Sequence, residues 1–95
     1  MVRPPARAMS GRARTLELRT DLAGRPRFYL AGRPAPSGSV VQLCFSGGWV
    51  TGRFDWSGDS TERPRFYCSI ELDGGGVEEH VVEIPDRALL RWPEA

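Results

Sequence analysis

His80 is the residue whose chemistry stands out first, because it is the single histidine of the chain. Glu78 precedes it by two positions, so in a β-strand the two side chains lie on one face. A histidine beside a carboxylate can serve as a general base. No sequence motif places a nucleophile beside this pair. A solvent-exposed histidine on a strand, without any function, explains the same two residues. A small enzyme that uses His80 is therefore the third of three functional hypotheses.

Other residue types that often build sites lack the spacing that such sites need. Gly74, Gly75 and Gly76 form a run that acidic residues flank and that contains no Lys, which is typical of a hairpin connection rather than a phosphate loop. Cys44 and Cys68 stand in apolar stretches and are too few for a disulfide framework. We predict no catalytic residues, no metal and no cofactor, and reduced cysteines that suit a cytoplasmic location.

Arginine dominates the binding chemistry that the composition offers. All thirteen basic residues are Arg, and the chain has no Lys. Guanidinium groups pair with phosphate or stack on aromatic rings, although a GC-rich genome produces the same bias without any function. Residues 1–38 carry eight Arg against two acids, a net charge of +6, whereas residues 39–95 carry five Arg against ten acids, a net charge of −5.

The basic half begins with a segment rich in Pro, Ala, Gly and Arg, which predicts a disordered arm over residues 1–13. Arg3, Arg7, Arg12 and Arg14, in this arm and at its end, could neutralise phosphates, so nucleic-acid binding is the second hypothesis. An inert tail fits the same residues. Because the rest of the chain is acidic, we rank a protein partner above a nucleic acid.

A pentapeptide, Arg-Pro-Arg-Phe-Tyr, occurs at residues 25–29 and again at residues 63–67. The residues that follow the two copies differ at once, so the chain has no true internal repeat. Both copies enter an expected strand from a Pro turn, and similar strand entries can use similar residues. The functional interpretation is two exposed Arg–Tyr clusters, which are typical of single-stranded nucleic-acid platforms and of protein hot spots.

The elements that would position these residues are short strands separated by turns rich in Gly and Pro. Alternating apolar residues predict strands over residues 15–20, 27–30, 39–46, 49–57, 65–72, 77–84 and 88–92. Gly47-Gly48 predicts a tight hairpin, and Gly52 predicts a bulge or bend inside a strand. The expected inner faces consist of Val41, Leu43 and Phe45; Val50, Gly52, Phe54 and Trp56; and Phe66, Cys68, Ile70 and Leu72.

These strands predict an all-β fold, a small antiparallel barrel of five or six strands that forms one domain over residues 14–95. The chain length suits a single small domain. No secretory signal is expected at residues 1–14, because no apolar core follows the basic residues, and no stretch is long and apolar enough to span a membrane. A homodimer through exposed strand edges is left open.

Residues 38–43 and 48–54, which read GSVVQL and GWVTGRF, resemble the opening hairpin of SH3-like and Tudor-like barrels. Residues 84–92 look like the close of such domains, a 3₁₀ turn before a last strand. Residues 27–92 also resemble a family of small bacterial domains of unknown function, known mainly as accessory or mobile-element-associated proteins, through FYLAGRP, GGWVTGRFDW and ELDGGGVEEH. The resemblance implies an SH3-like barrel and a binding role.

In Tudor-like domains, rim aromatic residues form a cage for methylated Lys or Arg. The resemblance implies Trp49, Phe54, Trp56 and Tyr67 as the rings, with Asp55 as a candidate acid. Core packing is the competing interpretation, because Phe54 and Trp56 fall on the expected inner face.

The first hypothesis is therefore a non-enzymatic module that binds a protein through arginine and aromatic side chains at the barrel rim. The residues expected to make this contact are Arg27, Tyr29, Trp49, Arg53, Arg65 and Tyr67.

Overall fold

A computed structural model describes residues 12–93, which contain eight β-strands and no helix. The all-β, antiparallel prediction is confirmed for this part of the chain, and it holds no helix that could cross a membrane. Most of the expected arm, including Arg3 and Arg7, lies outside the described residues. The strands are β1 (Glu17–Thr20), β2 (Pro26–Leu30), β3 (Arg33–Pro34), β4 (Val40–Phe45), β5 (Gly48–Asp55), β6 (Arg65–Glu71), β7 (Val77–Glu83) and β8 (Leu90–Arg91).

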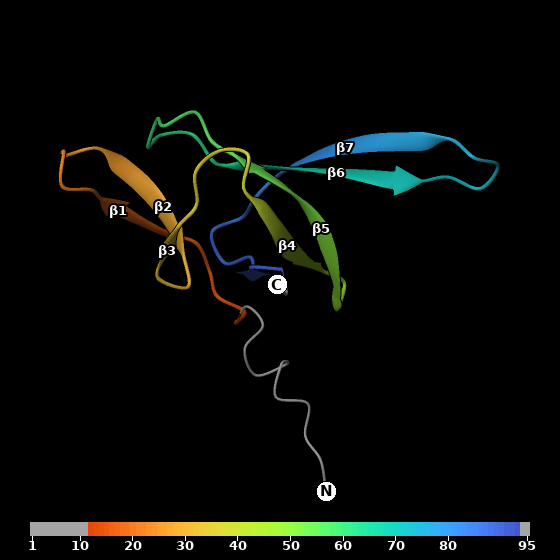
Figure 1. Ribbon diagram of the computed structural model, residues 1–95, viewed down its shortest axis with the longest axis horizontal. Helices are drawn as coiled ribbons and strands as arrows, with labels where there is room; N and C mark the ends of the chain where they lie inside the picture. The colour runs from red at the N-terminus through yellow and green to blue at the C-terminus, as the bar shows by residue number, and fades with distance from the viewer. Residues whose placement is uncertain (1–11, 94–95) are drawn as a thin grey trace, which may run out of the picture.

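The strands form two antiparallel sheets, one in the order β1-β2-β3 and one in the order β7-β6-β5-β4-β8 (Figure 1). Strands β4 to β7 follow one another as a meander, and β8 returns to pair with β4 through Gln42 and Arg91. Arg14 forms an isolated bridge to Leu90, with backbone N···O distances of 2.9 and 2.8 Å. This bridge holds the segment before β1 against β8.

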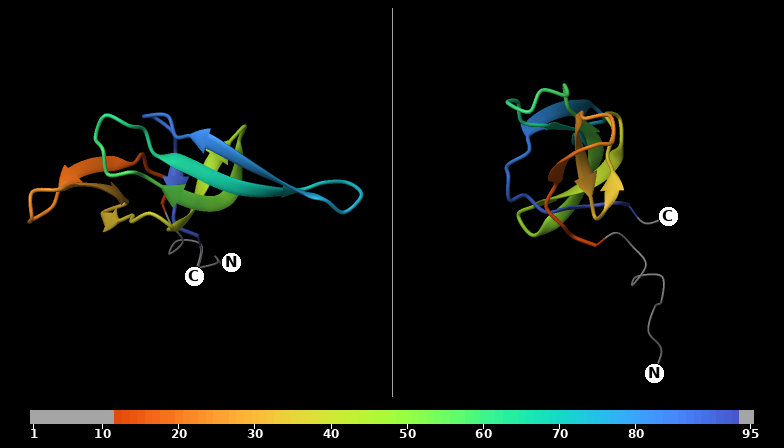
Figure 2. Two further views of the ribbon diagram at one scale, coloured as in Figure 1. Left: turned by 90° about the horizontal axis from the view of Figure 1, so that it is seen from above. Right: turned by 90° about the vertical axis from the view of Figure 1, so that its left-hand side faces the viewer.

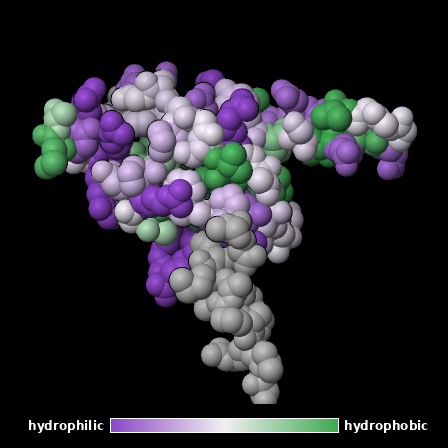
Figure 3. All heavy atoms as spheres, viewed as in Figure 1, coloured by the Kyte–Doolittle hydropathy of each residue, from purple (hydrophilic) through white to green (hydrophobic). Residues whose placement is uncertain are grey.

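The two sheets do not form a closed barrel, so the prediction of a small antiparallel barrel is confirmed only as an all-β, antiparallel fold. Strands β7 and β8 are the two edges of the five-stranded sheet and do not pair with each other. Figure 2 shows the reason, because β6 and β7 run past the other strands as a projecting two-stranded ribbon. This ribbon carries exposed hydrophobic residues among polar ones (Figure 3), and they include Ile70, Leu72 and Val77.

The core lies where the two sheets face each other. Phe28 of β2 meets two aromatic rings edge to face, with centroid distances of 6.0 Å to Phe54 of β5 and 4.6 Å to Trp56, which directly follows β5. Trp92 donates its indole N–H to the carbonyl oxygen of Leu30 at 2.8 Å. Burial of apolar surface drives this packing, and the buried residues are Phe28, Leu30, Ala35, Val41, Leu43, Phe54, Phe66, Cys68, Ile84 and Leu90.

The expected inner faces are confirmed near the core and wrong beyond it. On β5, Phe54 is buried and Val50 packs against the core, as does Trp56 just after the strand. Ile70 and Leu72, by contrast, are each 45% exposed, because the end of β6 and the residue after it belong to the projecting ribbon. Phe45, at the end of β4, is also exposed rather than on the core face. Alternation assigns a face to each residue, but it does not show where the opposite layer ends.

The β4–β5 hairpin turns one residue earlier than predicted. Its loop residues are Ser46 and Gly47, with φ angles of 48° and 81°, and Phe45 pairs with Gly48. A two-residue turn with positive φ at both positions favours glycine, so the Gly47-Gly48 pair was the expected site. Ser46 takes the first position instead, and Gly48 becomes the first residue of β5.

Candidate binding face

The outer face of the five-stranded sheet gathers four of the six residues that the sequence predicted for binding. Trp49 and Arg53 alternate along β5 with side chains of the core, and Arg65 and Tyr67 do so along β6. Arg53 lies directly opposite Tyr67, and Arg65 lies opposite Asp55. Side chains directly opposite in a sheet are neighbours on one face. Trp49, Arg53, Arg65 and Tyr67 are named below as the outer-face cluster.

Two guanidinium groups stack on rings of this face. The Arg53 Cζ atom lies 5.4 Å from the centroid of the Tyr67 ring, and the Arg91 Cζ atom lies 4.2 Å from that of Trp49. Each such contact at an exposed site contributes about 0.5–1 kcal/mol. The stacks hold large, flat groups in place, so a partner meets a surface that is already ordered.

Arg91 is a member of this face that the sequence analysis missed. Its Nε donates to Gln42 Oε1 at 2.6 Å, and Gln42 Nε2 donates to Thr51 Oγ1 at 3.0 Å. These bonds join β8, β4 and β5 across the face. The strand expected over residues 88–92 predicted that Arg91 would lie on an exposed face. Nothing in the sequence predicted that it would contact Trp49.

The sheet opens between β5 and β6 beside the outer-face cluster. The two strands pair only from Arg53 to Asp55 of β5. Before this segment β5 pairs with β4 alone, and beyond Tyr67 strand β6 pairs with β7 alone, so the strands diverge from Gly52 (Figure 1). A depression of about 350 Å³ lies at the opening, with Thr51, Arg53, Tyr67 and Ser69 among its lining residues.

The face combines cationic, aromatic and apolar groups in one row across four strands. The register places Val40 opposite Arg53, Arg53 opposite Tyr67, and Tyr67 opposite Val81. Val40 and Val81 are both exposed. Within residues 12–93, neither Arg53 nor Arg65 forms an ion pair. The Arg53 charge is therefore available to a carboxylate from outside this part of the chain, whereas Arg65 lies between Asp55 and Glu83 in the register.

Arg27 and Tyr29, the other two predicted residues, lie on the three-stranded sheet and do not join this face. Arg27 Nε pairs with Asp21 Oδ2 at 2.8 Å. The Tyr29 ring lies under Arg19, whose Cζ atom is 4.9 Å from the ring centroid. The six residues thus divide between two surfaces rather than forming one rim.

Asp21 organises the turn before β2. Its Oδ1 accepts the backbone N–H groups of Ala23 and Arg25, both at 2.9 Å, and its side chain is only 15% exposed. The hydrogen bond from the Arg25 backbone, followed by that from the Arg27 side chain, lowers the pKa of Asp21 below its usual value of 3.8. Hydrogen bonds to the charged form stabilise the carboxylate.

Asp21→Asn is expected to lower the urea midpoint of unfolding at neutral pH. Because the folded-state pKa is depressed, the stabilisation is complete above 3.8 and is lost as the pH falls through the lower folded value. The difference in urea midpoint between the variant and the original protein should therefore be smaller in acid, below pH 3.8, than at neutral pH. The exposed Asp73→Asn serves as the control and should change neither midpoint. An Asp21→Asn effect of equal size at both pH values would contradict this account.

The methyl-cation cage that the resemblance implied is wrong for this structure. Phe54 is buried in the core, and Trp56 donates its indole N–H to the carbonyl oxygen of Glu62 at 3.0 Å. Trp49 and Tyr67 lie on the opposite face of the sheet from Phe54. The four rings therefore do not surround one space.

His80 and Glu78 share a face, as predicted, with 2.7 Å between Nε2 and Oε1. The register also places His80 opposite Cys68, a proximity that the sequence analysis did not foresee. No hydrogen bond joins this thiol to the imidazole in the described part of the chain. No group of three or more His, Cys, Asp or Glu residues that could hold a metal ion occurs there either.

The two described arginines from the nucleic-acid hypothesis lie away from the outer-face cluster. Arg12 and Arg14 are exposed and line a depression beside β1 with Leu16 and Glu17. Glu17 adds a negative charge there, so this surface is not a purely basic patch.

No family model, no curated protein and no solved structure matches this chain. The resemblances to SH3-like and Tudor-like barrels and to small bacterial domains stay predictions, and the geometry carries the functional argument.

Proposed function

We propose that this protein is a non-enzymatic binding module that takes an extended, acidic segment of a partner protein beside its outer-face cluster. The observation that carries the proposal is the opening between β5 and β6, which Arg53 and Tyr67 flank. The opening combines unpaired strand edges, aromatic rings and cationic side chains at one place.

The opening supplies backbone groups for a segment that binds as a strand. In an antiparallel pair, successive residues direct their N–H and C=O groups to opposite sides of the strand. The register with β4 therefore directs those of Trp49 and Thr51 toward the opening, and the register with β7 does the same for Ser69. Extended peptides commonly add to such edges, where main-chain hydrogen bonds provide affinity.

The side chains around the opening favour an acidic segment with apolar residues. Arg53 lines the depression and carries a charge without an ion-pair partner among residues 12–93, and guanidinium groups bind carboxylates through two parallel hydrogen bonds. Trp49 offers an aromatic surface, and Trp, Tyr and Arg are the residue types that dominate binding energy at protein interfaces. Glu79 lies at the same depression and would disfavour a second acidic group nearby.

An SH3-like or Tudor-like fold belongs to the same proposal. Strand β8 follows a single turn, in which Ala88 N–H donates to the Pro85 carbonyl oxygen at 3.2 Å, and then pairs with β4. This supports the resemblance of residues 84–92 to the close of such domains. Cys44 and Cys68 are both free thiols, which fits the proposed cytoplasmic setting.

Arg53→Ala is expected to weaken the binding of selected peptides roughly tenfold or more, because it removes both a charge and a ring contact. Peptides would be selected from a displayed library of random linear sequences and their affinities measured by fluorescence anisotropy. Arg87→Ala removes the same charge from an exposed turn outside the opening and should leave the affinities unchanged.

Two results would contradict the proposal. One is a selection that yields no peptide, and the other is equal binding by the Arg53→Ala and Arg87→Ala proteins. A random DNA or RNA oligonucleotide tests the second hypothesis in parallel. If the oligonucleotide binds with an affinity that falls steeply as the salt concentration rises, and the peptides do not bind, the results would favour phosphate contacts instead.

A further inference from the structure

The two copies of the Arg-Pro-Arg-Phe-Tyr pentapeptide use their first arginine differently. In the second copy, Arg63 donates from Nε to the Ile84 carbonyl oxygen at 3.0 Å and pairs through Nη1 with Asp86 at 2.7 Å. Its guanidinium thus fastens the end of β7 and the turn after it. In the first copy, the Arg25 side chain has no hydrogen bond or ion pair with any of residues 12–93.

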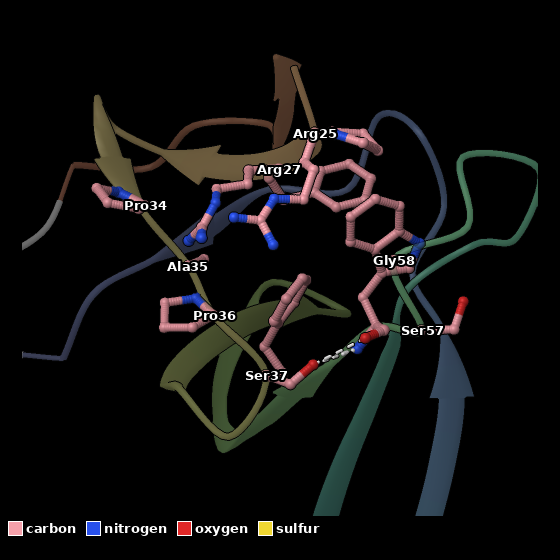
Figure 4. Close-up of a pocket in the computed structure, with 12 residues that line it drawn as sticks. Arg25, Arg27, Pro34, Ala35, Pro36, Ser37, Ser57 and Gly58 are labelled. Carbon is pink, nitrogen blue, oxygen red and sulfur yellow. Dashed lines mark hydrogen bonds between the residues drawn. The ribbon is translucent and has the colours of Figure 1, made fainter. Parts of the chain in front are cut away.

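Arg25 instead lines a pocket of about 210 Å³ that lies between the two sheets. Figure 4 shows that the Arg25 and Arg27 side chains both extend into this pocket from the same end of β2. Phe28 and Trp56 complete an apolar wall, with their ring centroids 4.6 Å apart. The pocket therefore places two cations beside aromatic surface.

The charges in the pocket are only partly balanced by the protein. Asp21 accepts from Arg27 Nε at 2.8 Å, which leaves the terminal nitrogens of Arg27 and the whole Arg25 guanidinium available. Both side chains line the same pocket, so an anion bound there is attracted by two positive charges. Guanidinium forks match the geometry of phosphate and bind it through paired hydrogen bonds.

The volume of the pocket limits the size of the chemical group that carries the anion. A cavity of about 150 Å³ accommodates a benzene molecule, so about 210 Å³ has room for one ring and a small charged group. We propose that this pocket binds a phosphate carried on a single aromatic ring, with the phosphate on Arg25 and Arg27 and the ring against Phe28 and Trp56. This site is separate from the outer-face cluster, and its test does not depend on the proposed function.

Phenyl phosphate is the probe for this pocket. In an NMR titration of the full chain, it should produce saturable shifts of the Trp56 indole N–H and of the Ser37 backbone N–H. Arg25→Ala should weaken binding roughly tenfold or more, and Arg25→Lys should weaken it less, because Lys keeps the charge but lacks the planar fork. Arg87→Ala, which changes an exposed turn that does not line the pocket, should leave the affinity unchanged.

Three results would overturn the inference. They are no saturable shift at millimolar phenyl phosphate, unchanged binding by Arg25→Ala, and equal affinity for inorganic phosphate alone, which would exclude the ring contact. A peptide containing phosphotyrosine distinguishes the source of the ligand. Binding at least tenfold tighter than that of phenyl phosphate would support a protein side chain, and equal affinity would support a free small molecule.

Discussion

Replacing Gly52 with alanine is expected to destabilise the protein by about 3 kcal/mol or more. A Cβ atom at this position would lie 2.5 Å from the Phe66 Cζ atom and closer still to the carbonyl oxygen of Tyr67. The Phe66 ring is fully buried, and the Tyr67 backbone pairs with the neighbouring Arg53. Neither group can move without disturbing the core or the junction of β5 and β6.

The free energy of unfolding from urea titrations, followed by tryptophan fluorescence, measures this loss. Gly48→Ala is a matched control on the same strand, because its Cβ would meet only the Phe45 carbonyl oxygen at an ordinary 3.7 Å and its φ is not positive. We expect a change of at most about 0.5 kcal/mol in either direction there. Equal stabilities of the two variants would show that the close approach at Gly52 is wrong.

Phe54→Ala is expected to cost about 4 kcal/mol, the range for large aromatic side chains removed from a core. Phe54 is 1% exposed and meets the Phe28 ring edge to face at 6.0 Å, so it joins the two sheets. Phe45 provides a control of the same residue type. It is 41% exposed near the end of β4, and its replacement by alanine should cost about 1 kcal/mol.

A loss of this size is a large part of the free energy of unfolding of a small domain, which is about 5–15 kcal/mol. Phe54→Leu is a milder variant that keeps the folded state populated and should cost less than Phe54→Ala. Heat and urea unfolding of the three variants, followed by circular dichroism, gives the comparison. If Phe45→Ala proved as costly as Phe54→Ala, the face assigned to β4 or the extent of the core would be wrong.

Much of the secondary structure could be predicted from the sequence, because the central strands are amphipathic. The alternation around Leu43, Phe54 and Phe66 identified β4, β5 and β6 and the residues that face the core. Whether the sheets close into a barrel could not be predicted in the same way. It depends on how far β6 and β7 extend beyond the opposite layer, which is a property of the whole packing and not of one strand.

The sequence predicted only part of the candidate site, because alternation describes single strands and not the packing between distant ones. Exposed positions on β5 and β6 followed from alternation, so Trp49, Arg53, Arg65 and Tyr67 could be chosen together. The stack of Arg91 on Trp49 joins residues far apart in the sequence, and only the return of β8 to β4 brings them together. The pocket around Arg25 could not be predicted either, because its aromatic wall combines Phe28 of β2 with Trp56, which follows β5.

Strand β8 has two residues, yet its surroundings connect the two sheets at several points. Leu90 pairs with β4 and also with Arg14, and the neighbouring Trp92 bonds to Leu30 of the smaller sheet. Contacts that link separate parts of a fold make their opening a single event. Amide protons in β2 and in β4 should therefore exchange with solvent with a common free energy of opening, as one cooperative unit that the last described residues hold closed.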